Sequence, residues 1–325
     1  MRILTQDDVR RALPMKQAIE ALGPAFAQLS TGKADVPLRT PLTVDRHNGV
    51  TLFMPAYLSD DDSMAVKIVS VFNDNPARGL PLIHALVVVV DAETGQPSAV
   101  MEGSYLTALR TGAASGLATD LLARQDAHSV AIFGAGVQGR TQLEAICAVR
   151  QIEQAWVYDL AARQAVLFAE EMTEQLSLPV EVVVASAEAL EEADIICTAT
   201  TSSTPVFEAA DIRPGTHINA VGAYTPQMQE IPAQTVLRAK VVIDHREASL
   251  AEAGDLLIPL NQGRMTEGHI HAELGEIVVG QKPGRTSPDQ ITLFKSNGLA
   301  IQDAATALLV YQKAREAGLG VEVEV

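Results

Sequence analysis

The amino-acid sequence predicts an α/β protein with two domains of different construction. In the first hundred residues, five β-like runs follow one another with short turns between them, which is typical of an antiparallel sheet. From Val130 onward, apolar strand-like runs alternate with helix-like segments, which is typical of a doubly wound, mostly parallel sheet. At 325 residues the chain is long enough for two domains and for a large core.

The N-terminal part begins with two helices. Thr5 and Asp8 form a capping-box pattern that predicts the start of the first helix, which ends near Pro14. Pro14 suits the first turn of a second helix over residues 15–30, which Gly32 closes. Turn-forming residues separate the β-like runs that come next. These runs are 39–45, 50–55, 65–72, 83–91 and 98–102, and a helix over about 105–124 follows them.

The alternating part supplies the second domain. Its expected strands are 130–133, 155–158, 180–184, 194–199, 217–221 and 240–243. Its expected helices are 138–150, 162–176, 187–191, 232–237 and 247–253. A last helix over about 298–317 comes after this sheet is complete, so we expect it to pack on the N-terminal domain and make that domain discontinuous. The predicted domains are therefore 1–115 with 298–325, and 116–297.

A glycine-rich turn follows the first strand of the alternating part. Gly134, Gly136 and Gly139 give the pattern G-x-G-x-x-G, and Asp159 ends the next strand 20 residues after Gly139. This strand–turn–helix–strand setting is that of the Rossmann dinucleotide-binding fingerprint. The first glycine permits a tight turn, the second lets backbone approach a pyrophosphate, and the third allows close helix packing. The free N–H groups and the dipole of the following helix then hold the anion.

Asp159 also bears on the choice of cofactor. A carboxylate at the end of the second strand can accept hydrogen bonds from both ribose hydroxyls of NAD(H). It would repel the 2′-phosphate of NADP(H) by roughly 4 kcal/mol at about 4 Å before screening. NAD(H) is therefore favoured, whereas NADP(H) stays possible because Arg163 is near enough in sequence to bind a phosphate.

Composition excludes several classes of partner. The net charge of −16 argues against nucleic acid and anionic membranes, which need a basic surface. No apolar run approaches the roughly 20 residues that span a bilayer, and the N-terminus has no hydrophobic signal core, so we expect a cytoplasmic protein. The two cysteines, Cys147 and Cys197, are interpreted as buried free thiols. No His, Cys or acidic cluster has the spacing of metal ligands, so no metal is predicted.

Eight motifs are spread along nearly the whole chain, from about 5 to 311: VK at 66–67, GLP at 79–81, ALRTGAA at 108–114, FGAGVQ at 133–138, PGTHINAVGA at 214–223, AGD at 253–255, AELGE at 272–276 and FKS at 294–296. Together they resemble the motifs of the ornithine cyclodeaminase/μ-crystallin family. The resemblance implies a homodimer that pairs through the sheet of the N-terminal domain, where the substrate binds, and an active site between the two domains. Members of the family include amino-acid cyclodeaminases, an alanine dehydrogenase, imine and ketimine reductases and a hormone-binding crystallin.

Three cations are candidates for binding a carboxylated substrate. Lys67 has apolar neighbours on both sides, and burying it is costly unless it is paired or its pKa falls. The resemblance implies that Lys67 contacts the substrate and moves a proton; the alternative is an edge-strand lysine that reaches solvent. It also implies that Arg39 and Arg110 bind the carboxylate, for which a guanidinium is well shaped. The alternative for both arginines is an ordinary salt bridge.

The remaining candidates follow from the resemblance and the fingerprint. Met54 and Glu252 are expected at the substrate pocket, although simple packing and a helix-surface position are their respective alternatives. Arg110 is also expected beside the cofactor. The other expected cofactor-binding residues are Thr111, Gly134, Gly136, Val137, Gln138, Gly139, Asp159, Thr200, Val221, Gly222, Ala223 and Ser296.

Two departures from the family pattern narrow the expected reaction. Ornithine cyclodeaminases carry a catalytic aspartate where this sequence has Tyr224, and a glutamate where it has Leu52. The run that contains Tyr224 resembles the family's Δ1-pyrroline-2-carboxylate reductases instead, and Tyr224 is a second candidate catalytic residue. The expected activity is NAD(P)H-dependent reduction of a cyclic imino acid with a five- or six-membered ring. Amino-acid deamination of the ornithine or alanine type, and non-enzymatic binding of NAD(P)H and a small ligand, are the alternatives.

Overall fold

The computed structural model describes residues 1–324, and the chain divides into two compact units. Unit 1 comprises residues 1–110 and the chain from 299 onward, and unit 2 comprises residues 111–298. Helix α3 (Gly103–Leu122) runs across the first boundary. The sequence predicted domain boundaries after residue 115 and after residue 297. The first falls within α3, and the second falls one residue before the end of unit 2. The functions expected for the two domains stay predictions.

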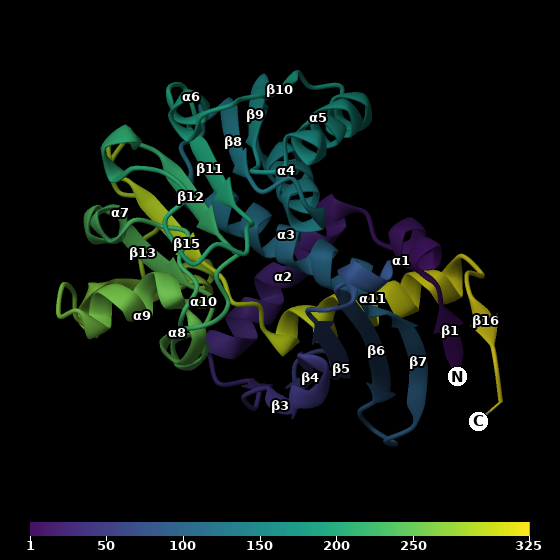
Figure 1. The fold of residues 1–325 in the computed structure, drawn as a ribbon. Helices are drawn as coiled ribbons and strands as arrows, with labels where there is room; N and C mark the ends of the chain where they lie inside the picture. Colours follow the sequence, from purple (N-terminus) through teal and green to yellow (C-terminus); the bar gives the residue numbers. More distant parts are fainter. Residues whose placement is uncertain (325) are drawn as a thin grey trace. The chain divides into compact units, whose positions relative to one another are not determined.

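Unit 1 contains a mainly antiparallel sheet with the strand order β16-β1-β7-β6-β5-β4-β2, and β3 pairs with β4 (Figure 1). Only β1 and β7 are parallel neighbours. The five predicted runs are confirmed as β3 to β7, whereas the short strands β1, β2 and β16 were not predicted. The strands are β1 (Arg2–Leu4), β2 (Ala34–Asp35), β3 (Thr40–Val44), β4 (Gly49–Leu58), β5 (Ser63–Phe72), β6 (Ile83–Asp91), β7 (Pro97–Glu102) and β16 (Val321–Glu322).

Three helices accompany this sheet. The predicted capping box starts α1 (Gln6–Ala12), since Thr5 Oγ1 accepts from Asp8 N and Thr5 N donates to Asp8 Oδ2. Pro14 precedes α2 (Met15–Ser30), which has the predicted bounds. The last helix, α11 (Ala300–Glu316), packs against β4, β5 and β6 of the sheet and against α1 and α2. Short 3₁₀ turns lie at η1 (Asp45–His47) and η2 (Pro76–Arg78).

Unit 2 contains a fully parallel sheet with the strand order β10-β9-β8-β11-β12-β15-β13-β14. The chain steps outward in one direction from β8 to β9 and β10, and in the other from β8 to β11 and β12, which is the doubly wound topology. The strands are β8 (Ser129–Phe133), β9 (Gln154–Tyr158), β10 (Val180–Val182), β11 (Ile195–Thr198), β12 (His217–Ala220), β13 (Lys240–Ile243), β14 (Ile270–Glu273) and β15 (Thr292–Lys295).

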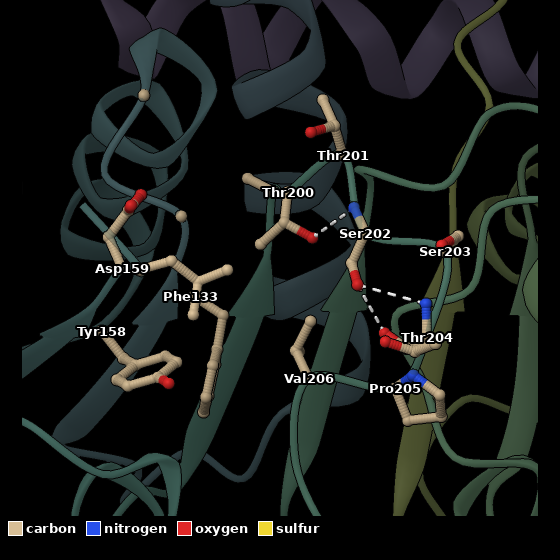
Figure 2. A pocket seen from close by; sticks show the side chains of 14 residues that line it. Phe133, Tyr158, Asp159, Thr200, Thr201, Ser202, Ser203, Thr204, Pro205 and Val206 are labelled. Carbon is tan, nitrogen blue, oxygen red and sulfur yellow. Dashed lines mark hydrogen bonds between the residues drawn. The ribbon is translucent and has the colours of Figure 1, made fainter.

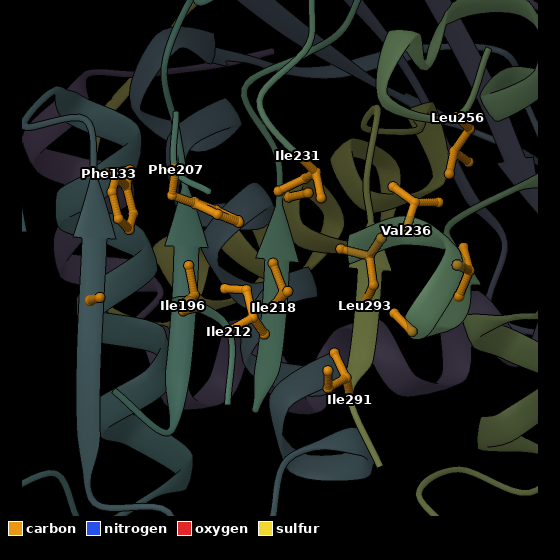
Figure 3. Packing of buried hydrophobic residues seen from close by; sticks show 14 of the residues in the cluster. Phe133, Ile196, Phe207, Ile212, Ile218, Ile231, Val236, Leu256, Ile291 and Leu293 are labelled. Carbon is orange, nitrogen blue, oxygen red and sulfur yellow. The ribbon is translucent and has the colours of Figure 1, made fainter. Parts of the chain in front are cut away.

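Side chains of the parallel strands enter two cores, one on each face of the sheet. Alternate residues point to opposite faces, so Ile132 packs with α4 and α5, while Phe133 lies in the other core with Phe207 and Ile218 (Figure 3). The helices and 3₁₀ turns of unit 2 are α4 (Val137–Val149), α5 (Ala162–Leu176), α6 (Ser186–Leu190), η3 (Ala209–Asp211), α7 (Ala233–Arg238), α8 (Arg246–Glu252), α9 (Gly254–Asn261), η4 (Glu267–His269) and α10 (Leu274–Val278).

The sequence interpretation missed four elements of unit 2, namely α9, β14, α10 and β15. Strand β15 lies between β12 and β13 although it follows both in the chain, so its pairing is a tertiary property. Its four residues are all buried, and such a short apolar run carries no periodicity that separates a strand from a loop. Among residues 1–324, no helix is both long enough and apolar enough to cross a membrane.

Candidate functional site

A cavity of about 640 Å³ opens in unit 2 at the carboxyl ends of β8, β9 and β11 (Figure 2). Its walls come from the glycine turn after β8, from the end of β9 and the two residues that follow it (158–160), and from residues 199–206 after β11. The strand order reverses between β8 and β11, and this is the place where open α/β sheets bind their ligands. The topology therefore puts the cavity at the expected site of a dinucleotide.

The glycine turn has the geometry that the fingerprint predicts. Gly134 has a φ of 104°, and a Cβ on it would lie 2.6 Å from the carbonyl oxygen of Ala199. A Cβ on Gly139 would overlap the carbonyl oxygen of Gly134, so helix α4 packs directly on the turn. In contrast, a Cβ on Gly136, the N-cap of α4, would meet open space. The tight turn and the close helix packing are confirmed, and the room above Gly136 fits an approaching pyrophosphate.

Asp159 ties the turn to the end of β9. Its Oδ2 accepts a hydrogen bond from Ala135 N at 2.8 Å, and its Oδ1 accepts one from Ala161 N at 2.8 Å. Each oxygen has a second lone pair, and the carboxylate lines the cavity, so it can still accept from a ligand hydroxyl. The predicted contact with a cofactor ribose stays a prediction.

A buried acid that the sequence interpretation missed organises the other wall of the cavity. Glu230 accepts hydrogen bonds from Thr200 N at 2.6 Å, from Thr200 Oγ1 at 2.8 Å and from Thr198 Oγ1 at 2.9 Å. It also accepts from Gly222 N at 2.7 Å and from Ala223 N at 3.0 Å. One carboxylate thus joins the loop after β11 to the loop after β12. Burial and the nearby Asp255 raise the pKa of Glu230, while Lys295 lowers it.

Asp255 and Lys295 complete this buried group. Lys295 Nζ lies 3.2 Å from Asp255 Oδ2 and donates to the carbonyl oxygen of Ala223 at 2.5 Å. Asp255 Oδ1 accepts from the backbone N–H of Glu230 at 2.7 Å. Asp255 lies in the motif AGD and Lys295 in the motif FKS, and both motifs carried the family resemblance. These motifs were the signal by which the sequence could have identified the two residues. The group fixes the backbone at the ends of β12 and β15.

Unit 1 contains a second group of buried charges, built on the central strand of its sheet. Lys67 lies on β5, between β4 and β6, and its side chain is 1% exposed. The alternative of an edge-strand lysine that reaches solvent is therefore wrong. Lys67 Nζ lies 2.7 Å from Asp303 Oδ2 on α11, and the strand register sets Met54 of β4 opposite Lys67.

Arg110 shares the same acid. Its Nε donates to Asp303 Oδ1 at 3.0 Å, and its Nη1 donates to Gln302 Oε1 at 2.6 Å. The ordinary salt bridge considered as an alternative for Arg110 is thus present. The sequence interpretation missed Asp303 and Gln302, because neither lies in one of the motifs that marked binding residues. We call Lys67, Arg110, Gln302 and Asp303 the β5–α11 cluster.

The surroundings of Lys67 change its acidity. Burial lowers the pKa of Lys67 to about 7, Arg110 and Arg39 lower it by repulsion, and Asp303 opposes them. The charge of Arg39, which precedes β3, therefore acts on the β5–α11 cluster. Three cations and one carboxylate leave the region with an excess of positive charge, which suits an anion. A lysine titrating near neutrality can also give or take a proton at physiological pH.

The other predicted residues lie in varied places. Tyr224 is 39% exposed, and Ser296 is buried with its hydroxyl donating to Asp244 Oδ2 at 3.1 Å. Val137 and Gln138 lie in the first turn of α4, Thr111 is buried in α3, and Glu252 ends α8. Val221 follows β12. Their roles toward a cofactor or substrate stay predictions.

The doubly wound sheet, the glycine turn and the acid after the second strand define a dinucleotide-binding protein of the Rossmann class. The chain belongs to the ornithine cyclodeaminase/mu-crystallin family, whose profile matches residues 1–318. The family predicted from the sequence motifs is confirmed, as is the predicted fold class.

Three relatives illustrate the likeness. The solved Thermococcus litoralis Δ1-pyrroline-2-carboxylate reductase, in complex with NADH and L-proline, is 49% identical, with a TM-score of 0.97 over 99% of this chain and 100% of that one. A Bacillus cereus Δ1-pyrroline-2-carboxylate reductase is 40% identical over the full length of both chains. An archaeal alanine dehydrogenase dimer, solved with bound NAD, is 36% identical, with a TM-score of 0.93 over 100% of this chain and 99% of that one.

Proposed function

We propose that this chain is an NADH-dependent reductase of a cyclic imino acid, and that it converts Δ1-pyrroline-2-carboxylate to L-proline. The observation that carries the proposal is the β5–α11 cluster, in which a fully buried lysine with a pKa of about 7 lies among arginines. Two relatives that match over nearly the whole chain are reductases of this substrate. The six-membered analogue is a second substrate to test, since the cluster by itself does not select ring size.

The residues of the cavity in unit 2 fit a dinucleotide. The open space at Gly136 and the N-terminus of α4 receive the pyrophosphate, and Asp159 accepts from the ribose. The Asp159 carboxylate also makes NADH the preferred form, with NADPH as the weaker alternative. When bound, the cofactor supplies the hydride that the imine carbon accepts.

The cations of unit 1 bind and protonate the substrate in this proposal. Arg110 and Arg39 attract the carboxylate, and Gln302 and Asp303 hold the Arg110 guanidinium in one orientation. Lys67 gives a proton from Nζ to the imine nitrogen, and its pKa of about 7 makes that transfer nearly balanced at neutral pH. Met54, opposite Lys67, forms an apolar neighbour for the ring.

Two residues favour reduction over deamination of ornithine. Where cyclodeaminases of the family carry two acids, this chain has Tyr224 and Leu52. Neither side chain can act as the base that removes a proton from an ornithine amine. Tyr224 is partly exposed and can line the ring-binding pocket or donate a proton.

We extend the proposal to the assembly of the protein, a homodimer that pairs through the unit 1 sheet. The face of this sheet opposite Lys67 carries apolar side chains that stay accessible, among them Leu42 of β3, Leu86 of β6 and Ile68 of β5. Accessible apolar side chains on one face of a sheet are typical of a protein interface. A second copy of the chain is the proposed occupant, and one relative is a dimer.

The free thiols Cys147 and Cys197 fit the reducing cytoplasm expected for an NADH-dependent enzyme.

One set of assays tests the activity. The purified protein is incubated with NADH or NADPH and Δ1-pyrroline-2-carboxylate, and loss of the reduced-nicotinamide absorbance is followed. In parallel, ornithine and alanine are tested with NAD⁺ for release of ammonia. Imine turnover without ammonia is the expected result. Ammonia from either amino acid would replace the proposal by a deaminase, and cofactor binding without any turnover would replace it by a binding protein.

A further inference from the structure

Among residues 1–324, Asp303 is the acid that contacts both buried cations of the β5–α11 cluster. Its Oδ2 lies 2.7 Å from Lys67 Nζ, its Oδ1 lies 3.0 Å from Arg110 Nε, and its side chain is 1% exposed. The three residues come from β5, α3 and α11, so one carboxylate joins three separate elements of unit 1. A charge buried at this depth is stable only beside its counter-charge, which makes the arrangement a fixed one.

The charges around Lys67 are unequal. Arg110 and Arg39 repel its proton, burial disfavours its charged form, and Asp303 is the group that retains the proton. The strand register sets Met54 on one side of Lys67 and Val87 on the other, and neither carries a charge. Of these groups, Asp303 is the one that favours the protonated form of Lys67.

We propose that Asp303 is a positioning residue of the reductase, which keeps a transferable proton on Lys67 Nζ and aligns the Arg110 guanidinium together with Gln302. The inference rests on the proposed function and assigns roles to residues of α11 that contact Lys67 and Arg110. In the reduction, the Nζ–H bond of Lys67 breaks as the lone pair of the imine nitrogen forms a new N–H bond. The imine carbon accepts the hydride supplied by NADH. Lys67 is left as a neutral amine and regains its proton from water.

Gln302 offers a second means of changing the same charge balance. Its side chain is fully buried, its Oε1 accepts from Arg110 Nη1 at 2.6 Å, and its Nε2 has no hydrogen-bond partner among the described residues. A glutamate at this position has the same shape and adds a negative charge beside Arg110. The two isosteric changes, Asp303→Asn and Gln302→Glu, should thus move the acidity of Lys67 in opposite directions.

The test is the pH dependence of kcat/KM for Δ1-pyrroline-2-carboxylate in three proteins. In Asp303→Asn the alkaline limb of the profile should move to lower pH by about one unit or more, so that the rate at pH 8 falls about tenfold or more. At pH 5.5 the rate should recover to within about threefold of wild type, and KM for NADH should not change. In Gln302→Glu the limb should move to higher pH. Glu316→Gln, which changes an exposed acid on the same helix, should leave the profile unchanged.

The outcomes separate a positioning role from a structural one. A folded Asp303→Asn variant whose limb stays at the wild-type pH would overturn the inference. If that variant does not fold, Gln302→Glu decides alone, and an unmoved limb there has the same meaning. A second measurement needs no turnover. The chemical shift of the Lys67 ε-carbon, assigned by its absence in Lys67→Arg, is followed against pH in the same proteins. Lys67 should titrate at the lowest pH in Asp303→Asn and at the highest in Gln302→Glu. That order, found in a protein that does not reduce the imino acid, would support the role of Asp303 and refute the proposed substrate.

Discussion

Lys67 is the residue whose chemistry depends most on where the fold places it. An exposed lysine stays protonated well above neutral pH, but burial and two arginines lower the pKa of Lys67 to about 7. Protonated Lys67 is the reactive form in reduction. This form is present below the pKa of Lys67 and is lost above it. The kcat/KM for imine reduction should therefore fall by about tenfold per pH unit above pH 7, and the reverse oxidation should rise over the same range. Steady-state rates from pH 5.5 to 9 in both directions test this, and a profile that is flat across pH 7 would contradict it.

Removing the proton donor should separate chemistry from cofactor binding. Lys67→Met keeps the length of the side chain and removes the amine, so the reduction rate should fall by about 10²- to 10⁴-fold. Apart from Arg110, the residues expected to hold the cofactor all lie in unit 2, so the Kd for NADH, measured by fluorescence titration, should change less than about twofold. A variant that keeps wild-type turnover would refute the assigned role of Lys67.

At the scale of elements, the turn between β8 and α4 gives its three glycines different tasks. A Cβ on Gly139 overlaps the carbonyl oxygen of Gly134, whereas a Cβ on Gly136 enters open space. Gly139→Ala should therefore destabilise unit 2 by about 1–3 kcal/mol, as overpacking does. Gly136→Ala should leave the midpoint of thermal unfolding unchanged and weaken NADH binding, because the methyl group occupies the space meant for the pyrophosphate. Equal effects of the two changes on stability would contradict this division of tasks.

Strand β12 holds a second titratable group whose behaviour follows from burial. Burial, with help from Arg285, lowers the pKa of His217 to about 3, against the opposing hydrogen bond with Asn219. The unfolded chain binds a proton at this residue near pH 6.5 and the folded one does not, so stability falls as the pH drops from about 6.5 towards 3. His217→Gln should reduce that loss by up to about 1.4 kcal/mol per pH unit. Urea unfolding of both proteins at pH 7, 5 and 4 measures the difference, and parallel pH dependences would show that His217 does not contribute.

At the scale of the whole molecule, the proposed dimer pairs through the accessible apolar face of the unit 1 sheet. If two copies pair through it, a charge at its centre must be desolvated in the dimer. Leu86→Glu should then shift the protein from dimer to monomer in light scattering, while Val184→Glu, which changes an exposed apolar residue of unit 2, should not. A Leu86→Glu variant that stays dimeric would place the interface elsewhere.

Much of the candidate site could be predicted from local patterns. The glycine turn, Asp159 and the strands around them have short-range signatures, and Lys67 and Arg110 attract notice as charges inside apolar runs. Asp303, Gln302 and Glu230 have no such signature. Asp303 lies three residues after Ala300 and one before Ala304, so it shares a helix face with alanines and has no motif of its own. Strand β15 was missed for a related reason, since its place between β12 and β13 contradicts chain order.

The sequence by itself determined the two kinds of sheet, the dinucleotide fingerprint and the family, because each depends on the order and spacing of neighbouring residues. Only the tertiary structure decided which charges meet. Arg110 and Asp303 are 193 positions apart, and their 3.0 Å contact exists because α11 returns to pack on β5. The acidity of Lys67 depends on that packing, since a pKa reflects burial and nearby charge rather than the residues adjacent in the chain.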